Sequence, residues 1–173
     1  MIFSKEDQLI IQCARGWLNE EVVAAVSSLL RQELDWDYIL DAAILHAVAP
    51  LVYRSLRQVR DTQETVPVPP TVWETLQRLY SNNVIRNRRL YSTIGEIVKA
   101  LKAENIDVMG LKDLVLGQTV FSDIGLRPMG DIDILIHKKD YDRFVKCMAN
   151  LGFSPLPDPD CPYLLKYAWA LHF

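Results

Sequence analysis

This sequence has few cysteines, and it has neither a long apolar run nor a basic N-terminal leader. Each of these features argues against a class of protein. The three cysteines, Cys13, Cys147 and Cys161, are odd in number and widely spaced, which predicts neither a disulfide framework nor a zinc site. We expect small buried or half-buried thiols in a reducing compartment. No stretch approaches the roughly 18 apolar residues of a membrane span, and residues 1–8 carry acids where a signal peptide is basic and then apolar. The sequence therefore predicts a cytoplasmic protein with no membrane partner.

The sequence also lacks a basic excess and a glycine-rich phosphate loop. Its formal net charge is −3 at pH 7, whereas general nucleic-acid binding depends on many cationic side chains that neutralise phosphates. We therefore expect no strong general nucleic-acid binding, although one nucleotide in one pocket is compatible with this charge. The missing glycine-rich loop weighs against the phosphotransferase folds that bind phosphate with such a loop.

The first part of the chain is predicted to be a helical subdomain. Apolar residues recur at helical spacing through the first sixty residues. Ser4, with Asp7 three residues later, forms a capping-box pattern, and further helices are expected after Asn19 and near Asp35. Pro50 is expected to end or kink the third helix. A stiff proline-containing linker at residues 60–70 then closes the subdomain, residues 1–70.

The second part, residues 71–173, is predicted to change from helical to mixed structure. It opens with a long helix, expected over residues 71–104 with a capping box at its start. Beyond this helix the pattern predicts short strands and helices with a small mixed sheet, so the fold class is α+β. The expected elements are a strand at 106–111, a helix at 113–121, a loop at 122–130, an isoleucine-rich strand and a helix at 138–150 that Gly152 ends.

Two aspartates at the head of the isoleucine-rich strand are the strongest chemical signal. Ile132, Ile134 and Ile136 alternate with period two, so Asp131 and Asp133 are expected to project together from the opposite face of the strand. Adjacent carboxylates repel each other unless a cation lies between them. A divalent ion such as Mg²⁺, bound by carboxylate oxygens and substrate phosphates, removes this conflict. A solvated strand start is the structural alternative for the same pair.

The stretch from Gly110 to Ile136 resembles the uncharacterised nucleotidyltransferases, a branch of the nucleotidyltransferase superfamily that includes DNA polymerase beta. The similarity is carried by Leu111-Lys112 at a strand end, by Gly125-Leu126-Arg127-Pro128 in the loop, and by Gly130-Asp131-Ile132-Asp133. It implies a minimal nucleotidyltransferase core behind the helical subdomain. It also implies transfer of a nucleoside monophosphate from an NTP to an unknown hydroxyl acceptor, with Mg²⁺ or Mn²⁺ as cofactor.

The resemblance also implies roles for individual residues. Asp131 and Asp133 would be the catalytic carboxylates and the metal ligands. Lys112 would contact the triphosphate as a point charge, and Gly130 would let the backbone approach the ligand. Arg127 would contact phosphate in a bidentate manner or lock its loop onto a carboxylate. Lys112 as a solvated lysine and Arg127 as a structural arginine are the alternatives.

The sequence departs from the family pattern in two places. Asp113 stands where the family has glycine. A helix N-cap is the simple role for it, but its carboxylate would repel an anion. The family also places a third carboxylate in an acid-x-His-Trp stretch, whereas the printed sequence ends in Trp169-Ala-Leu-His-Phe173 without an acid. We therefore expect these 173 residues to be catalytically inactive or nearly so, and to self-associate through an exposed sheet edge. The alternative function is a non-catalytic nucleotide- or protein-binding regulatory module.

Overall fold

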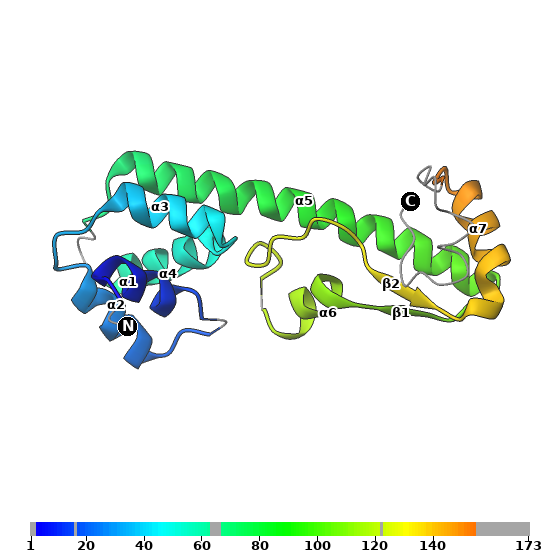
Figure 1. Ribbon diagram of the computed structural model, residues 1–173, viewed down its shortest axis with the longest axis horizontal. Helices are drawn as coiled ribbons and strands as arrows, with labels where there is room; N and C mark the ends of the chain where they lie inside the picture. Colours follow the sequence, from blue (N-terminus) through cyan, green and yellow to red (C-terminus); the bar gives the residue numbers. More distant parts are fainter. Residues whose placement is uncertain (1–2, 16, 63–66, 122, 155–173) are drawn as a thin grey trace. The chain divides into compact units, whose positions relative to one another are not determined.

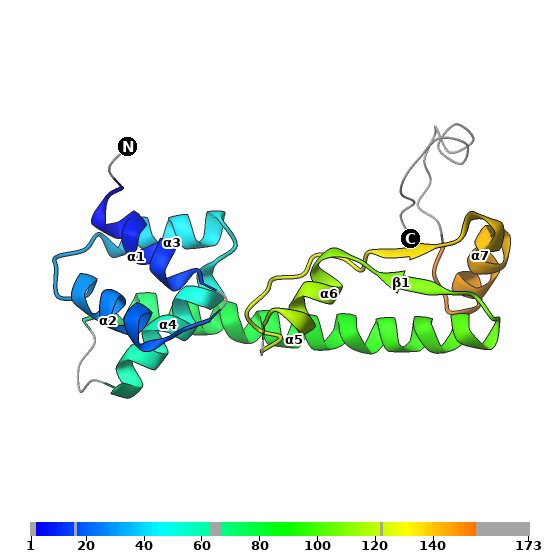
Figure 2. The same cartoon turned by 90° about the horizontal axis from the view of Figure 1, so that it is seen from below.

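The computed structural model describes residues 3–15, 17–62, 67–121 and 123–154, and its first four helices form a bundle (Figures 1 and 2). These helices are α1 (Lys5–Cys13), α2 (Glu20–Leu29), α3 (Trp36–Leu45) and α4 (Ala49–Thr62). The predicted caps are confirmed, because Ser4, Asn19 and Asp35 each accept a hydrogen bond from a backbone N–H of the first turn that follows.

The bundle core is apolar and includes the first turns of the long helix α5 (Pro70–Ala103). Its fully buried members come from five helices and include Leu9, Val26, Ile39, Leu56 and Leu76. Cys13 is buried among them, and this burial raises the pKa of its thiol to about 12. The predicted buried thiols are thus confirmed for Cys13 and Cys147, whereas Cys161 lies outside the described residues.

Several predicted boundaries were wrong for local reasons. The third helix ends at Leu45, where Ala47 adopts a positive φ of 55°, and Pro50 instead lies in the first turn of α4, where a missing N–H costs nothing. α4 runs to Thr62, into the expected linker. α5 begins at Pro70, so Thr71 lies inside its first turn rather than at a cap. Trp17, four residues beyond the end of α1 at Cys13, is 68% exposed.

The chain divides into two compact units, and α5 contributes to both. The first unit comprises residues 1–91 and 112–133, and the second comprises residues 92–111 and 134–173. The first therefore holds the bundle, the start of α5, α6 (Lys112–Thr119) and the segment that leads to the aspartates. Of the helices within the described ranges, none combines the length and apolar character needed to cross a bilayer.

The second unit holds the only strands of the described residues, β1 (Val108–Gly110) and β2 (Ile134–Ile136). They pair antiparallel in the register Val108↔Ile136 and Gly110↔Ile134. The predicted mixed sheet is therefore corrected to a two-stranded antiparallel one. Helix α7 (Tyr141–Asn150), preceded by the 3₁₀ turn η1 (Lys138–Asp140), lies beside the C-terminal end of α5 in both views (Figures 1 and 2), and Gly152 follows it with φ 88°, as predicted.

The strands are shorter than predicted, and the two aspartates precede β2 instead of lying in it. The register explains this difference. Gly110 pairs with Ile134, and two residues later the chain turns into α6 at Lys112, which has a positive φ of 46°. The ladder between β1 and β2 therefore ends at the pair Gly110–Ile134. Ile132 and Ile134 are half-buried.

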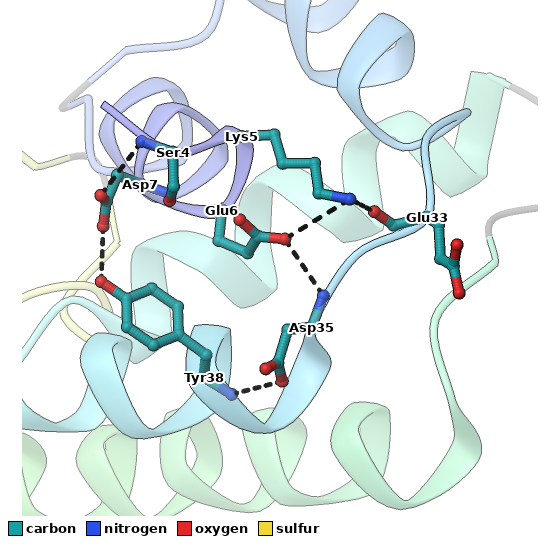
Figure 3. Close-up of polar contacts among 7 residues, drawn as sticks. All are labelled: Ser4, Lys5, Glu6, Asp7, Glu33, Asp35 and Tyr38. Carbon is teal, nitrogen blue, oxygen red and sulfur yellow. Dashed lines mark hydrogen bonds and ion pairs between the residues drawn. The ribbon is translucent and has the colours of Figure 1, made fainter. Parts of the chain in front are cut away.

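Polar contacts join the start of α1 to the start of α3 (Figure 3). The Tyr38 hydroxyl donates to Asp7 Oδ1 at 2.7 Å, and the Asp35 N–H donates to Glu6 Oε1 at 3.2 Å. Lys5 lies between, 3.8 Å from Glu6 Oε1, and also donates to the Glu33 carbonyl. The hydrogen bond from Tyr38 holds the pKa of the Asp7 carboxyl below its ordinary value of 3.8. This contact therefore favours the folded chain only while Asp7 is ionised.

Tyr38→Phe should reduce stability in a pH-dependent way. A carboxyl whose pKa is lowered by folding stabilises the protein above its unfolded pKa and loses that contribution as pH falls through the folded pKa. The difference in unfolding free energy between wild type and Tyr38→Phe should be full above about pH 5 and should shrink below about pH 4. Urea unfolding across this range measures it, with Asp41→Asn, an exposed carboxylate on the same helix, as control. A difference that stays constant with pH would contradict this role of Asp7.

Gly125→Ala should destabilise the first unit. A Cβ at Gly125 would lie 2.5 Å from Val84 Cγ2 and 2.6 Å from the Tyr80 ring, so the loop would have to move away from α5. We expect a loss of about 1–3 kcal/mol, as for overpacking in a core. Gly95→Ala is the matched control, because a Cβ there has nothing within 4 Å and should stabilise the helix by about 0.5–1 kcal/mol. Thermal unfolding gives both signs, and equal shifts would refute the close-approach argument.

Candidate functional site

Lys112 lies at the turn between β1 and α6. Its backbone has left-handed dihedrals, which cost a non-glycine residue of order 1 kcal/mol and occur where the surroundings fix the chain. Its side chain is 70% exposed, and its ammonium nitrogen lies 2.9 Å from Asp133 Oδ1. The lysine that was predicted to meet a triphosphate is therefore bound to one of the two predicted metal ligands.

Asp131 and Asp133 act on this one ammonium together. The hydrogen bond and charge of Asp133 are the main causes that raise the pKa of Lys112, and the charge of Asp131 raises it further. Asp131 is exposed, whereas Asp133 is half-buried. The paired carboxylates thus already attract a cation, which is the electrostatic property that the sequence pattern predicts.

Arg127 pairs with Asp113, the residue that departs from the family pattern. Arg127 Nε and Nη2 lie 2.9 Å and 2.7 Å from the same oxygen, Asp113 Oδ1. Of the two roles expected for Arg127, this arrangement is the one that locks its loop onto a carboxylate. Asp113 lies in the first turn of α6 rather than at a cap. Because its charge is compensated by a guanidinium, it repels a nearby anion less than a free carboxylate would.

Gly130 lies next to the aspartates in open space. It is exposed, and a Cβ placed there would have nothing within 4 Å. No packing requirement of the described residues therefore explains the glycine. Its predicted part in letting the backbone approach a ligand stays a prediction.

The donor set suits a hard divalent cation but is incomplete by itself. Carboxylate oxygens are the ligands that Mg²⁺ prefers, and the Lys112 ammonium already occupies a cation position on Asp133. Within the described part of the chain, no cluster of three or more His, Cys, Asp or Glu side chains could hold a metal ion. A metal on Asp131 and Asp133 would therefore need further oxygens, such as those of a triphosphate.

The site is an alternation of charges in one unit of the chain. Asp113, Asp131 and Asp133 are offset by Lys112 and Arg127, which leaves one net negative charge. All five residues belong to the first unit. Such a set can bind a cation at the exposed end near Asp131 and an anion at Lys112 once this lysine leaves Asp133.

Sequence reasoning missed the residues of α5 that hold this region. Tyr80, Asn83 and Asn87 donate hydrogen bonds to the segment between α6 and the aspartates, and Tyr91 donates to the Leu114 carbonyl of α6. Their spacing of i, i+3, i+7 and i+11 places them on one helix face. Two asparagines on an otherwise apolar stripe were the available signal, because buried amides need partners.

Comparison with known families gives this geometry its context. The family model described as an uncharacterised nucleotidyltransferase matches residues 32–168, which is more than half of the chain. Comparisons with curated proteins and with solved structures gave no match. The match includes β1, α6, the Gly-x-Arg-Pro loop and both aspartates. The chain therefore belongs to the uncharacterised nucleotidyltransferase family.

Proposed function

We propose that this protein binds a nucleoside triphosphate with Mg²⁺ or Mn²⁺ at the Lys112–Asp133 ion pair and the neighbouring Asp131. We propose that it then transfers the nucleoside monophosphate to a hydroxyl acceptor. The observation that carries the proposal is the contact of 2.9 Å between the Lys112 ammonium and Asp133, next to Asp131. It supports a cation site on the two carboxylates and an anion-binding lysine beside it. Family membership supports the reaction class.

Each residue of the candidate site has its own role in binding the metal ion or the triphosphate. Asp131 and Asp133 would hold the metal ion, which would supply positive charge to offset the negative charge that develops on the phosphate oxygens. Lys112, released from Asp133, would bind a phosphate oxygen. Arg127 would keep Asp113 neutralised, so that the start of α6 does not repel the triphosphate. In the free protein Asp133 and Asp113 are each paired with a cation, and in the proposed complex the metal ion would also neutralise Asp131.

A second function is a non-catalytic module that binds nucleotide. It is favoured by the lack of a third acidic ligand near Asp131 and Asp133 among the described residues. A screen of the four NTPs with Mg²⁺ or Mn²⁺ separates the two functions. Release of pyrophosphate that depends on an acceptor supports the transferase, whereas nucleotide binding without release supports the module.

Asp133→Asn should abolish nucleotide-dependent metal binding. Calorimetric titration of Mn²⁺ into wild type should show weak binding alone and tighter binding with a non-hydrolysable NTP, because the triphosphate supplies missing oxygens. In the variant the nucleotide-dependent affinity should fall at least about tenfold, with an unchanged circular dichroism spectrum. Asp107→Asn, an exposed acid, is the control. An Asp133→Asn titration like that of wild type would refute the metal site.

Lys112→Met should change metal and nucleotide binding in opposite directions. Mn²⁺ alone should bind about threefold tighter, since the competing ammonium of an exposed ion pair is gone. Binding of the Mn²⁺–NTP complex should weaken, since a phosphate contact is lost. Lys102→Met, an exposed lysine on α5, is the control for net charge. Parallel changes in both affinities would contradict the dual role of Lys112.

A further inference from the structure

One face of α5 is built from hydrogen-bond donors in a buried setting. We call Tyr80, Asn83, Asn87 and Tyr91 the α5 donor face. Asn87 is 1% exposed and Asn83 is 8% exposed. Asparagine is rarely buried and is a weak helix former, so packing and helix propensity both favour another residue at these positions.

The donor face binds the backbone of the segment that precedes the aspartates. The Asn87 amide donates to the carbonyls of Ile124 and Arg127, the latter at 2.7 Å. The Asn83 amide donates to the Gly125 carbonyl at 2.7 Å. These three carbonyls belong to a turn with no strand or helix partner, so the side chains of α5 supply the donors that regular structure would otherwise supply.

The two tyrosines fix the ends of the same surface. The Tyr80 hydroxyl donates to Asp123 Oδ2 at 2.5 Å, while Asp123 Oδ1 accepts the Gly125 N–H. The Tyr91 hydroxyl donates to the Leu114 carbonyl in α6 at 3.2 Å. A Cβ at Gly117 would lie 2.5 Å from that hydroxyl. Both α6 and the turn are therefore seated directly on α5.

Arg127 connects the α5 donor face to the candidate site. Asn87 holds the Arg127 carbonyl, and the Arg127 guanidinium holds Asp113 at the start of α6. Lys112 is the neighbour of Asp113 in the chain and carries the contact to Asp133. A shift of the turn would thus move the guanidinium away from Asp113, at the start of α6 where Lys112 lies.

Asn87 shows a cost that packing alone does not explain. Its Oδ1 is buried without a hydrogen-bond partner among the described residues. An unsatisfied buried acceptor is destabilising, and an apolar residue of similar size would avoid it. The benefit of the asparagine is its two amide hydrogens, which specify where the Ile124 and Arg127 carbonyls lie.

We infer that Asn87 is a positioning residue: by holding the Arg127 backbone it places the guanidinium for its ion pair with Asp113, and this pair in turn positions Lys112 for its contact with Asp133. The inference deepens the proposed function and rests on it for the nucleotide-binding consequence. The effect on the ion pair stands without that function. Measuring the ion pair and nucleotide binding separately therefore shows whether the role of Asn87 or the proposed function is wrong.

The test is the coupling between Arg127 and Asp113, measured with and without Asn87. Arg127→Met, Asp113→Asn and the double variant give the coupling as a ratio of unfolding constants. We expect about threefold in wild type, as for a partly exposed ion pair, and no coupling in an Asn87→Leu background. Asn82→Leu is the matched control, since Asn82 is exposed on the same helix, and should leave the coupling intact.

Coupling that persists in Asn87→Leu would overturn the inference, even if that variant is less stable, because a purely structural asparagine lowers stability without changing the ion pair. If Asn87→Leu does not fold, Asn87→Ser carries the same cycle, with the same loss expected and the same persistence contradicting it. In parallel, the Mn²⁺–NTP affinity should fall about tenfold in Asn87→Leu relative to Asn82→Leu. Lost coupling in a protein whose wild type binds no nucleotide would sink the proposed function and keep the positioning role.

Discussion

The candidate site depends on the hydrogen bonds from the two buried amides of α5 to the turn that precedes the aspartates. Asn83 and Asn87 supply donors to three carbonyls in a segment without regular secondary structure. Gly125 permits this contact, because any side chain there would collide with Val84 and Tyr80. A long helix thereby does what a larger sheet would otherwise do, since the two strands of the described residues are only three residues each. The position of the Arg127 guanidinium follows from that turn.

The chemistry of the site is a problem of charge that the free protein solves internally. Asp131 and Asp133 repel each other, and Lys112 relieves the repulsion at a distance of 2.9 Å from Asp133. Arg127 neutralises Asp113 in the same way. In the proposed complex the metal ion would face Asp131 and Asp133, Lys112 would face a phosphate oxygen, and Arg127 would stay on Asp113.

Local patterns predicted the helices and supplied the candidate site residues, whereas contacts distant in sequence decided how those residues are joined. Ser4, Asn19 and Asp35 announce helix starts because a cap acts within three residues. The aspartates were placed in a strand because isoleucines alternate there, but the strand ends where β1 turns away at Lys112. The Arg127–Asp113 pair spans fourteen residues. The sequence predicted a carboxylate partner as one of two roles for Arg127, but it gave no sign that Asp113 is that carboxylate. The donors of α5 act across about forty residues, beyond any local pattern.

The most direct test of the account is where a paramagnetic metal–nucleotide complex binds. Mn²⁺ with a non-hydrolysable NTP broadens amide NMR signals near the ion. Broadening is expected to centre on Asp131 and Asp133, to extend to Lys112 and Asp113, and to spare α2 and α3; Mn²⁺ without nucleotide should broaden these signals far less. Broadening centred on another part of the chain, or none at saturating complex, would contradict a nucleotide site built on the two aspartates and Lys112.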